Sequence, residues 1–555
     1  MAAFQQNKPK IFGCNDPKYV LENVPFSDIY CVAKQTDIEE ANLLNSRDKH
    51  EEAYRIYKTI LKRNPRHAGA LLGVGVILQK QEKFGIAIQF LSRSIEADPS
   101  NSHARLTRGR IYRLQGMSAN AISDFTDVIS NDPENFEAFI ARGITFGQAS
   151  RYHEAITDFS QAIDLKRKSA EAFYNRGVAF EKIRKLEAAI EDYSAAIKLN
   201  PTDGKAYNNR GLAFRELKKF EDAINDLREV VKIDPSFADA KFNLALTLLM
   251  TKNFSEGWQL YENRWETSNF PSAKRNFFQP LWLGKESLEG KSILIHSEQG
   301  LGDTLQFCRY LNLLKNLNCE VYFEVEQSLV RIISSNLNAK NIIPKGDDLP
   351  PFDFHCPLMS LPLAFGTTPE TIPVSGPYLF PDNRSINFWR QYLGAKKRLR
   401  IGIAWQGNPK HPRDVERSIR LQDLLRYAPK NIDWYALQKD VSDQDQITLS
   451  QIPNAHYFGG LIGDFNSTAA LCLNLDAIVS VDTSIAHLAG AVGSKTFLIL
   501  PFISDARWFS SGTKTPWYQS MEIIRQDRHR SWTSVLRILI RKLRRIQSQG
   551  TFTQN

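Results

Sequence analysis

Two short stretches of the chain carry residue types suited to phosphate binding or to acid–base catalysis. The stretch "HSEQGLGDTLQF" (residues 296–307) places two glycines and Asp303 directly after the apolar run "SILI". The stretch "VDTSIAHLAGAVG" (481–493) places Asp482, Thr483 and Ser484 where a helix should begin, with His487 three residues further on. A helix N-terminus offers free backbone N–H groups and a positive dipole end, so the second stretch suits a diphosphate.

The first stretch fits a catalytic loop better than a phosphate cradle. It lacks the lysine of a P-loop and the third glycine of a dinucleotide-binding loop. Glycines permit a sharp turn from strand to helix, and a carboxylate at the start of a helix is stabilised by the dipole. Asp303 is therefore a candidate general base. The alternative is that it only caps the helix, a role that aspartate often takes.

Composition limits the class of protein. A length of 555 residues predicts several domains, and no apolar run reaches the roughly 18 residues of a membrane span. The N-terminal residues lack the apolar core of a secretion signal, and the six cysteines form no CxxC pair, so we expect a cytoplasmic protein with reduced thiols. The net charge of +10 favours acidic partners such as phosphates.

The first half is built on a period of 34 residues. A glycine recurs from Gly75 to Gly211 and an alanine from Ala53 to Ala223, and the prolines on the same grid are Pro65, Pro99, Pro133, Pro201 and Pro235. This pattern resembles the tetratricopeptide repeat, a pair of antiparallel helices. Small residues let paired helices approach, and proline ends the second helix. We expect an α-helical solenoid over residues 34–264, after an N-terminal extension over residues 1–33.

Two further positions of the repeat are polar. Asn175, Asn209 and Asn243 occupy one position in successive units, where their amides have the donors and acceptors to hold a peptide backbone. Capping or hydrogen bonding within the repeats is an equal alternative. Arginines at the next position, such as Arg142 and Arg176, are expected to form ion pairs between helices.

The second half alternates short apolar runs with helical segments. After an aromatic linker or docking segment (265–290), the runs "SILIHS", "EVYFEV" and "NIIP" predict strands, as do "LRIGIAWQG", "IDWYALQ", "AIVSVD" and "TFLILPF". Two such blocks predict two parallel-sheet, Rossmann-like domains facing a cleft, over residues 291–385 and 386–546. The basic C-terminal helix is expected to pack back onto these domains, although peripheral membrane contact is an alternative.

Taken together, "GLGDTLQF", "IAWQGNPKH", "YALQKD" and "VDTSIAHLAGAVG" resemble the heptosyltransferase-like glycosyltransferases of family 9, which have the GT-B fold. The segment "EGWQLYENRW" (256–265) is similar to the one that joins tetratricopeptide repeats to such a domain. The resemblance implies an acceptor-side loop at Gln299, Gly300 and Gly302 with Asp303 as the catalytic base. It implies a nucleotide-sugar site made of Lys410, Arg417, Gln438, Lys439, Asp482, Thr483, Ser484 and His487, in which Lys410 or Arg417 neutralises the leaving diphosphate.

The expected function is therefore transfer of a sugar from a nucleotide-sugar donor to an acceptor, with inversion and without metal or other cofactor. The repeat array would recruit a protein whose hydroxyl accepts the sugar. A catalytically inactive protein-interaction scaffold is the alternative. A nicotinamide oxidoreductase is disfavoured because no strand is followed by a full GxGxxG. We expect no nucleic-acid partner.

Overall fold

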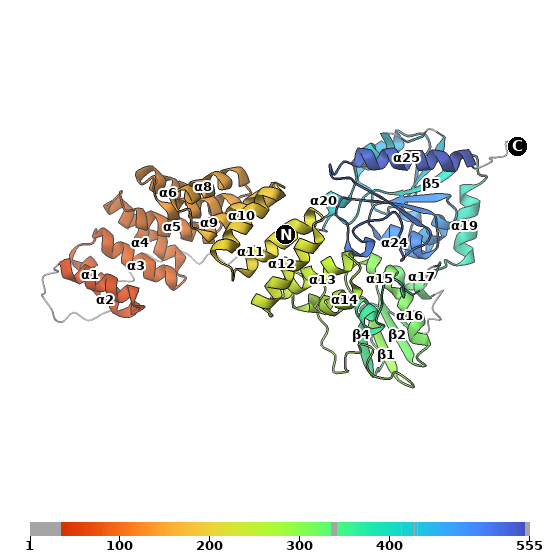
Figure 1. The fold of residues 1–555 in the computed structure, drawn as a ribbon, viewed down its shortest axis with the longest axis horizontal. Coiled ribbons are helices and arrows are strands. Elements are labelled where there is room, and N and C mark those ends of the chain that lie inside the picture. Colours follow the sequence, from red (N-terminus) through yellow and green to blue (C-terminus); the bar gives the residue numbers. More distant parts are fainter. Residues whose placement is uncertain are drawn as a thin grey trace. The chain divides into compact units, whose positions relative to one another are not determined.

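The computed structural model describes residues 35–334, 341–373, 376–411, 413–426, 428–429 and 431–549 (Figure 1). The predicted N-terminal extension (1–33) lies outside these residues. The described chain divides into two compact units, residues 35–217 and residues 218–549.

The first unit consists of paired antiparallel helices. Its helices are α1 (Gln35–Ser46), α2 (His50–Arg63), α3 (Ala68–Lys80), α4 (Phe84–Ala97), α5 (Ser102–Leu114), α6 (Ser118–Asn131), α7 (Phe136–Gln148), α8 (Tyr152–Leu165), α9 (Ala170–Lys182), α10 (Leu186–Leu199) and α11 (Gly204–Glu216). The second unit opens with helices on the same 34-residue grid, α12 (Phe220–Ile233), α13 (Ala238–Met250) and α14 (Phe254–Tyr261), followed by the short 3₁₀ helix η2 (Glu262–Glu266). The predicted helical solenoid is confirmed.

The grid glycines lie where the two helices of a repeat touch. A Cβ atom added to Gly143 on α7 would lie 2.7 Å from the Phe159 ring on α8, and one added to Gly177 would lie 2.9 Å from the Tyr193 ring. The grid alanines on the second helices, Ala155 among them, are fully buried. Small residues therefore set the close approach that the sequence pattern predicted.

The grid arginines bind across helices, as predicted. Arg142 forms a bidentate ion pair with Asp158, in which both contacts are 2.8 Å long. Its Nη1 donates to Thr126 Oγ1 at 3.0 Å. Arg176 repeats this arrangement with Asp192 and Ser160. Each arginine thus ties its own helix pair to the preceding one.

The first parallel sheet has the order β3-β2-β1-β4. Its strands are β1 (Ser292–His296), β2 (Glu320–Val325), β3 (Ile342–Pro344) and β4 (Phe354–Pro357), and the helices between them are α15 (Leu301–Phe307), α16 (Leu311–Lys315), α17 (Val330–Ser334) and α18 (Leu361–Ala364). Short 3₁₀ turns accompany them, η3 (Cys308–Tyr310), η4 (Gln327–Leu329) and η5 (Leu358–Ser360). Strand β4 lies in a proline-rich passage that carries no clear strand pattern in the sequence.

The segment between the repeats and this sheet docks on the sheet edge. The Trp282 N–H donates to the His355 carbonyl at 2.9 Å, and the His355 N–H donates to the Pro280 carbonyl at 3.1 Å. These bonds extend the sheet beyond β4, so the segment is a docking segment over at least these residues.

The second sheet has six parallel strands in the order β10-β9-β8-β5-β6-β7. They are β5 (Leu399–Ala404), β6 (Ile432–Ala436), β7 (Ala455–Tyr457), β8 (Ala477–Ser480), β9 (Thr496–Leu500) and β10 (Met521–Arg525). The helices are α19 (Asn383–Leu393), α20 (Asp414–Arg417), α21 (Leu421–Arg426), α22 (Asp443–Ser450), α23 (Phe465–Leu473), α24 (Ser484–Ala491) and α25 (Trp532–Gln549), with 3₁₀ turns η6 (Gly459–Leu461) and η7 (Ala506–Trp508). From β5 the chain runs outward to β7, returns to β8 beside β5, and runs outward again to β10, which is the doubly wound arrangement.

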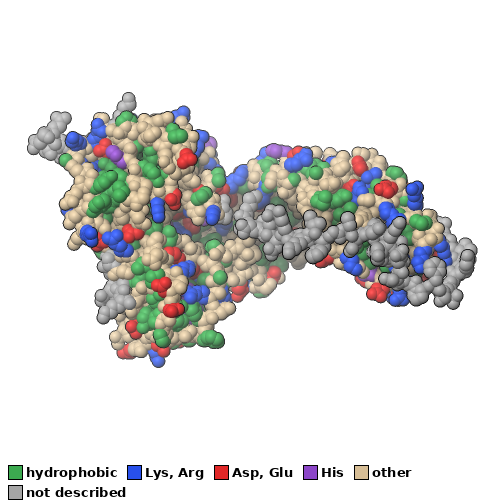
Figure 2. Space-filling model, turned by 180° about the vertical axis from the view of Figure 1, so that it is seen from behind, with side chains coloured by type: hydrophobic (Ala, Val, Ile, Leu, Met, Phe, Trp, Pro, Cys, Tyr) green, Lys and Arg blue, Asp and Glu red, His purple; other side chains and the backbone are tan. Residues whose placement is uncertain are grey.

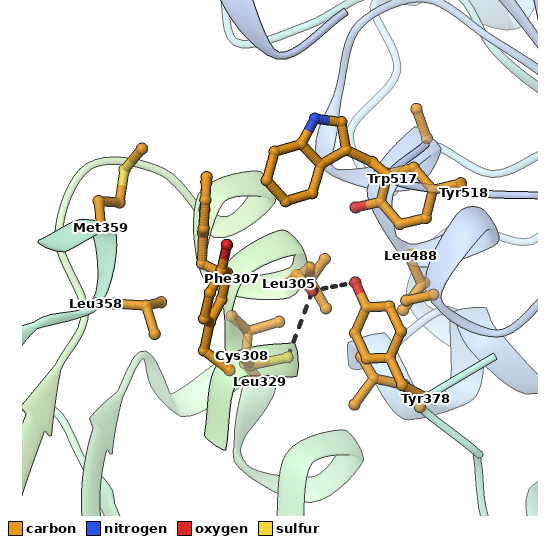
Figure 3. Close-up of a cluster of buried hydrophobic side chains, with 14 of the residues drawn as sticks. Leu305, Phe307, Cys308, Leu329, Leu358, Met359, Tyr378, Leu488, Trp517 and Tyr518 are labelled. Atoms are coloured by element: carbon orange, nitrogen blue, oxygen red, sulfur yellow. Dashed lines mark hydrogen bonds between the residues drawn. The ribbon is translucent and has the colours of Figure 1, made fainter. Parts of the chain in front are cut away.

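One apolar core joins the two sheets. Figure 3 shows Leu305 of α15 facing Tyr378 and Leu488, and the Tyr378 hydroxyl donates to the Leu305 carbonyl at 2.8 Å. The Tyr378 N–H in turn donates to the Ala491 carbonyl at the end of α24. Helices α15 and α24 therefore lie side by side between the sheets (Figure 1).

The basic C-terminal helix α25 packs on the second sheet, as expected. Its residues Val535, Leu536, Leu539 and Leu543 are buried in the core of this sheet. Within the described residues, no helix combines the length and the apolar character needed to cross a bilayer. Figure 2 shows basic and acidic side chains interspersed on the face in view, so no single-sign field dominates that face.

The glycine grid yields a stability prediction. Gly143→Ala places a methyl group against the Phe159 ring, and overpacking of about 1–3 kcal/mol outweighs the roughly 1 kcal/mol that alanine gains over glycine in a helix. Gly147→Ala on the same helix is the matched control, since an added Cβ there meets nothing within 4 Å. In urea unfolding, Gly143→Ala is expected to be less stable than wild type and Gly147→Ala at least as stable. The account of the repeat is wrong if Gly143→Ala is the more stable variant.

Candidate functional site

The topology of the second sheet locates a crevice. Strands β5 and β8 are neighbours, and the chain leaves them in opposite directions. In such sheets ligands bind beyond the carboxyl ends of these two strands. The loop after β8 contains Asp482 and Thr483, and the loop after β5 begins at Trp405. The residues selected from the sequence therefore lie at the switch point.

The N-terminus of α24 is open. Thr483 is the N-cap residue, but its side chain accepts no hydrogen bond from the helix. Instead the Thr483 hydroxyl lies 3.1 Å from the Ser480 hydroxyl. Ser484, the first helical residue, is half-buried. This end of the helix thus presents backbone N–H groups and two hydroxyls without a capping side chain of its own.

His487 is buried one turn into α24. Its Nδ1 lies 2.9 Å from the Tyr518 hydroxyl, its Nε2 lies 3.4 Å from Arg507 Nη1, and its ring stacks on Trp508 with centroids 5.0 Å apart. Burial lowers the pKa of His487 well below its ordinary value, and the Arg507 charge acts in the same direction. The imidazole is therefore neutral. Because Arg507 donates, Nε2 is the accepting nitrogen and Nδ1 carries the proton.

The two sequence motifs meet at this histidine. A Cβ atom added to Gly302 would lie 2.8 Å from His487 Cδ2 and 3.6 Å from Ser484 Cα. Any larger residue at position 302 would separate α15 from α24. The glycine is thus required for contact between the two loops, in addition to its role in the turn.

Asp303 is held at the start of α15 from two sides. Its Oδ2 accepts the Gly300 N–H at 3.0 Å, which is a capping contact. Its Oδ1 lies 2.6 Å from Arg507 Nη2. The capping role considered from the sequence is thus present, but it uses only one of the two carboxylate oxygens.

Arg507 is the centre of the site, and sequence reasoning missed it. Besides Asp303 and His487, its guanidinium contacts Asp505 at 2.8 Å and Gln306 at 3.5 Å. Burial alone would lower the pKa of Arg507, but Asp303, Asp505 and Asp482 together raise it well above its usual value. Its only signal in the sequence was a lone basic residue in the loop after a buried strand.

Asp482 belongs to the same cluster. Its Oδ1 lies 3.9 Å from His487 Nε2. Burial raises the pKa of Asp482, and the Arg507 and Arg417 charges act against that rise. The structure therefore brings Asp303, Asp482 and His487 together around one guanidinium.

The remaining predicted donor-site residues divide into two groups. Gln438 Oε1 accepts the N–H groups of Trp405 and Gln406 at 2.7 and 2.9 Å, so it shapes the loop after β5. Arg417 is mostly buried, pairs with Asp414 at 3.0 Å, and influences the pKa values of Asp482 and His487.

Lys410 and Lys439 form the second group, since both have exposed side chains. Of the two cations left open by the sequence, Arg417 is the one electrostatically linked to the cluster. The described residues contain no group of three or more His, Cys, Asp or Glu side chains placed to hold a metal ion.

The acceptor-side loop rests on a buried ion pair. Arg264, from the end of the repeat segment, binds both oxygens of Glu298 at 2.8 and 2.9 Å and donates to Ser360. The Met359 N–H donates to the same carboxylate. Gln299 follows with a positive φ of 62°, and its amide donates to the Tyr261 hydroxyl at 2.6 Å. The loop is thus fixed to the last repeat helices.

The asparagine ladder is divided between the units. Asn175 and Asn209 lie on α9 and α11 of the first unit, and Asn243 lies on α13 of the second. The Asn209 amide donates to the Tyr174 hydroxyl at 3.2 Å, which is a bond within the repeats. The peptide-binding role of the three residues stays a prediction.

Comparisons with known proteins identify the repeats. Family models described as "Tetratricopeptide repeat" match residues 38–102, 170–203 and 204–237, and one described as "TPR repeat" matches residues 146–183. The N-terminal half therefore contains tetratricopeptide repeats, which typically bind proteins or peptides.

Protein FlbA of Caulobacter vibrioides is 23% identical over 316 residues, covering 51% of this chain and 51% of FlbA. The chain thus spans about half the length of this relative. Among solved structures, a tetratricopeptide repeat protein from Parabacteroides merdae is 18% identical, with 41% of this chain and 90% of that chain covered and a TM-score of 0.35. YrrB, described as a TPR protein with an unusual peptide-binding site, is 20% identical, with 33% and 95% covered and a TM-score of 0.30.

The buried histidine yields a pH prediction. The unfolded chain takes up a proton at His487 near pH 6.5 and the folded protein does not. The contribution of His487 to the free energy of unfolding is therefore fully present above this pH and is lost progressively as the pH falls below it. The loss is up to about 1.4 kcal/mol per pH unit for this group. His487→Gln is expected to reduce the difference in the free energy of unfolding between pH 7.5 and 5.5, measured with urea. An unchanged difference would show that His487 is not buried in neutral form.

Proposed function

We propose that the C-terminal half is a glycosyltransferase of the GT-B, heptosyltransferase-like class (family 9-like). It would move a sugar from a nucleotide-sugar donor to a protein hydroxyl recruited by the repeat array. The observation that carries the proposal is that Arg507 joins the candidate base Asp303 to the cluster at the open N-terminus of α24. Two parallel sheets that share one core are compatible with the fold.

The donor diphosphate would bind at the N-terminus of α24. There it would accept hydrogen bonds from backbone N–H groups and from the hydroxyls of Thr483 and Ser484. Arg507, with Arg417 nearby, would supply positive charge as the leaving diphosphate gains negative charge. Neutral His487 would hold the guanidinium without competing for the anion.

Asp303 would accept the proton of the acceptor hydroxyl. The acceptor oxygen forms a bond to the anomeric carbon while the bond from that carbon to the diphosphate breaks, and the proton passes to the carboxylate. In the structure Asp303 is paired with Arg507. A bound diphosphate would compete for the same guanidinium, so donor binding would release the base. The order donor first, acceptor second follows from this competition.

A second candidate function is that of an interaction scaffold without activity. The repeats support protein binding by themselves. The same ion pair is compatible with this function if no ligand ever displaces Asp303 from Arg507. The two variants below distinguish the two functions.

Thr483→Val combined with Ser484→Ala tests the donor site. These changes remove two hydroxyls and keep side-chain volumes close to the original. A nucleoside diphosphate at a hundred times its dissociation constant should stabilise the wild-type protein by about 2.7 kcal/mol. In thermal shift assays with UDP, GDP, CDP and ADP, the double variant is expected to lose most of this stabilisation. If the same diphosphate stabilises both proteins equally, the site lies elsewhere.

Asp303→Asn tests the base. Asparagine still accepts the Gly300 N–H but cannot take up the proton, so transfer should slow by roughly 10²-fold or more while sugar nucleotide still binds. Asp505→Asn is the matched control, because it removes another carboxylate from the same guanidinium. The transfer rate of this control is expected to stay within about tenfold of wild type. A near-normal transfer rate for Asp303→Asn would show that Asp303 is not the catalytic base.

A further inference from the structure

A cavity of about 130 Å³ lies between the last repeat helices and the loops of both sheets, all within the second unit. Phe242 and Leu246 of α13 and Trp258 of α14 form one wall. Phe307 and Trp517 form another, with ring centroids 5.5 Å apart. Figure 3 shows Phe307 flanked by Met359, which also lines the cavity, on one side and by Trp517 on the other.

The size of the cavity selects its occupant. A cavity of about 150 Å³ with apolar walls binds benzene. The cavity of this protein is slightly smaller, so it holds one leucine or phenylalanine side chain and excludes a sugar nucleotide. Phe242 and Leu246 are only half-buried, so a side chain can enter between them and the opposite wall.

Part of the cavity lining is polar and belongs to the candidate active site. Gln299 and Arg507 both line the cavity. Arg507 pairs with Asp303, and Gln299 precedes Asp303 by four residues along the chain. A side chain in the cavity therefore lies beside Arg507, which contacts the candidate base Asp303.

We propose that this cavity is a specificity pocket for the acceptor polypeptide, taking one apolar side chain close in sequence to the hydroxyl that receives the sugar. The inference rests on the proposed function and names its acceptor class. The wall helices α13 and α14 lie on the grid of the tetratricopeptide repeats, so the module that binds proteins also forms the pocket beside the base.

The first test measures binding without catalysis. N-acetyl-L-leucinamide and N-acetyl-L-phenylalaninamide are expected to give saturation-transfer NMR signals with the full chain, and N-acetylglycinamide is not. Leu246→Trp fills the cavity and should abolish both signals. Leu473→Trp, the same change at an exposed leucine of α23, should retain them. Equal signals from both variants overturn the proposal.

A second variant keeps the test decisive if Leu246→Trp does not fold. Leu246→Ala enlarges the cavity and should shift binding toward N-acetyl-L-tryptophanamide relative to wild type. No shift in preference, from a folded protein, also overturns the proposal.

The second test measures transfer to a library of serine- and threonine-containing peptides. Wild type should enrich an apolar residue at one fixed offset from the modified hydroxyl. Leu246→Trp should lose this enrichment and keep the rate of donor hydrolysis. Equal loss of hydrolysis would assign the cavity to the donor and reject the proposal. If wild type turns over no sugar nucleotide, the proposed function fails, while the binding test still decides whether the cavity accepts an apolar side chain.

Discussion

The candidate site of the second unit depends on the contact between Asp303 and Arg507. This ion pair joins α15, which follows β1, to η7, which follows β9, so it links segments that follow one strand of each sheet. Gly302 permits the approach, and neutral His487 completes the guanidinium's contacts. Three carboxylates (Asp303, Asp482 and Asp505) and one cation beside an open helix end form a site that an anion can reorganise, because a diphosphate competes directly with the carboxylates for Arg507.

Much of the fold was predictable because the spacing of small and apolar residues along the chain reflects which side chains are buried. The 34-residue grid predicted the helix pairs, and apolar runs predicted seven of the strands. Strands β4, β7 and β10 were missed because none contains a run of three or more apolar residues: β4 follows prolines, His456 interrupts β7, and β10 has only Ile523 and Ile524 in succession. The turns inside the repeats were also not evident. Glu82, Ser150 and Arg184 adopt positive φ at equivalent positions of their repeats. Gly116 occupies the same position in another repeat, and of these four residues it alone has a type that predicts positive φ.

The candidate site was predictable where residues have fixed spacing along the chain. Asp303 and the group from Asp482 to His487 each follow a strand and open a helix, so local context identified them. Arg507 and the Arg264–Glu298 pair depend on contacts between distant segments, which no local pattern reports. Lys410 was ranked equally with Arg417 for a related reason, since only the fold distinguishes an exposed cation from one beside the cluster.

The competition between Asp303 and a diphosphate for Arg507 is tested most directly by a double-mutant cycle in ligand affinity. The quantity is the dissociation constant of the best-binding nucleoside diphosphate for wild type, Asp303→Asn, Arg507→Gln and the double variant. The account predicts that Asp303→Asn tightens binding several-fold when Arg507 is present and has no effect when it is replaced. Equal effects of Asp303→Asn in both backgrounds would contradict it.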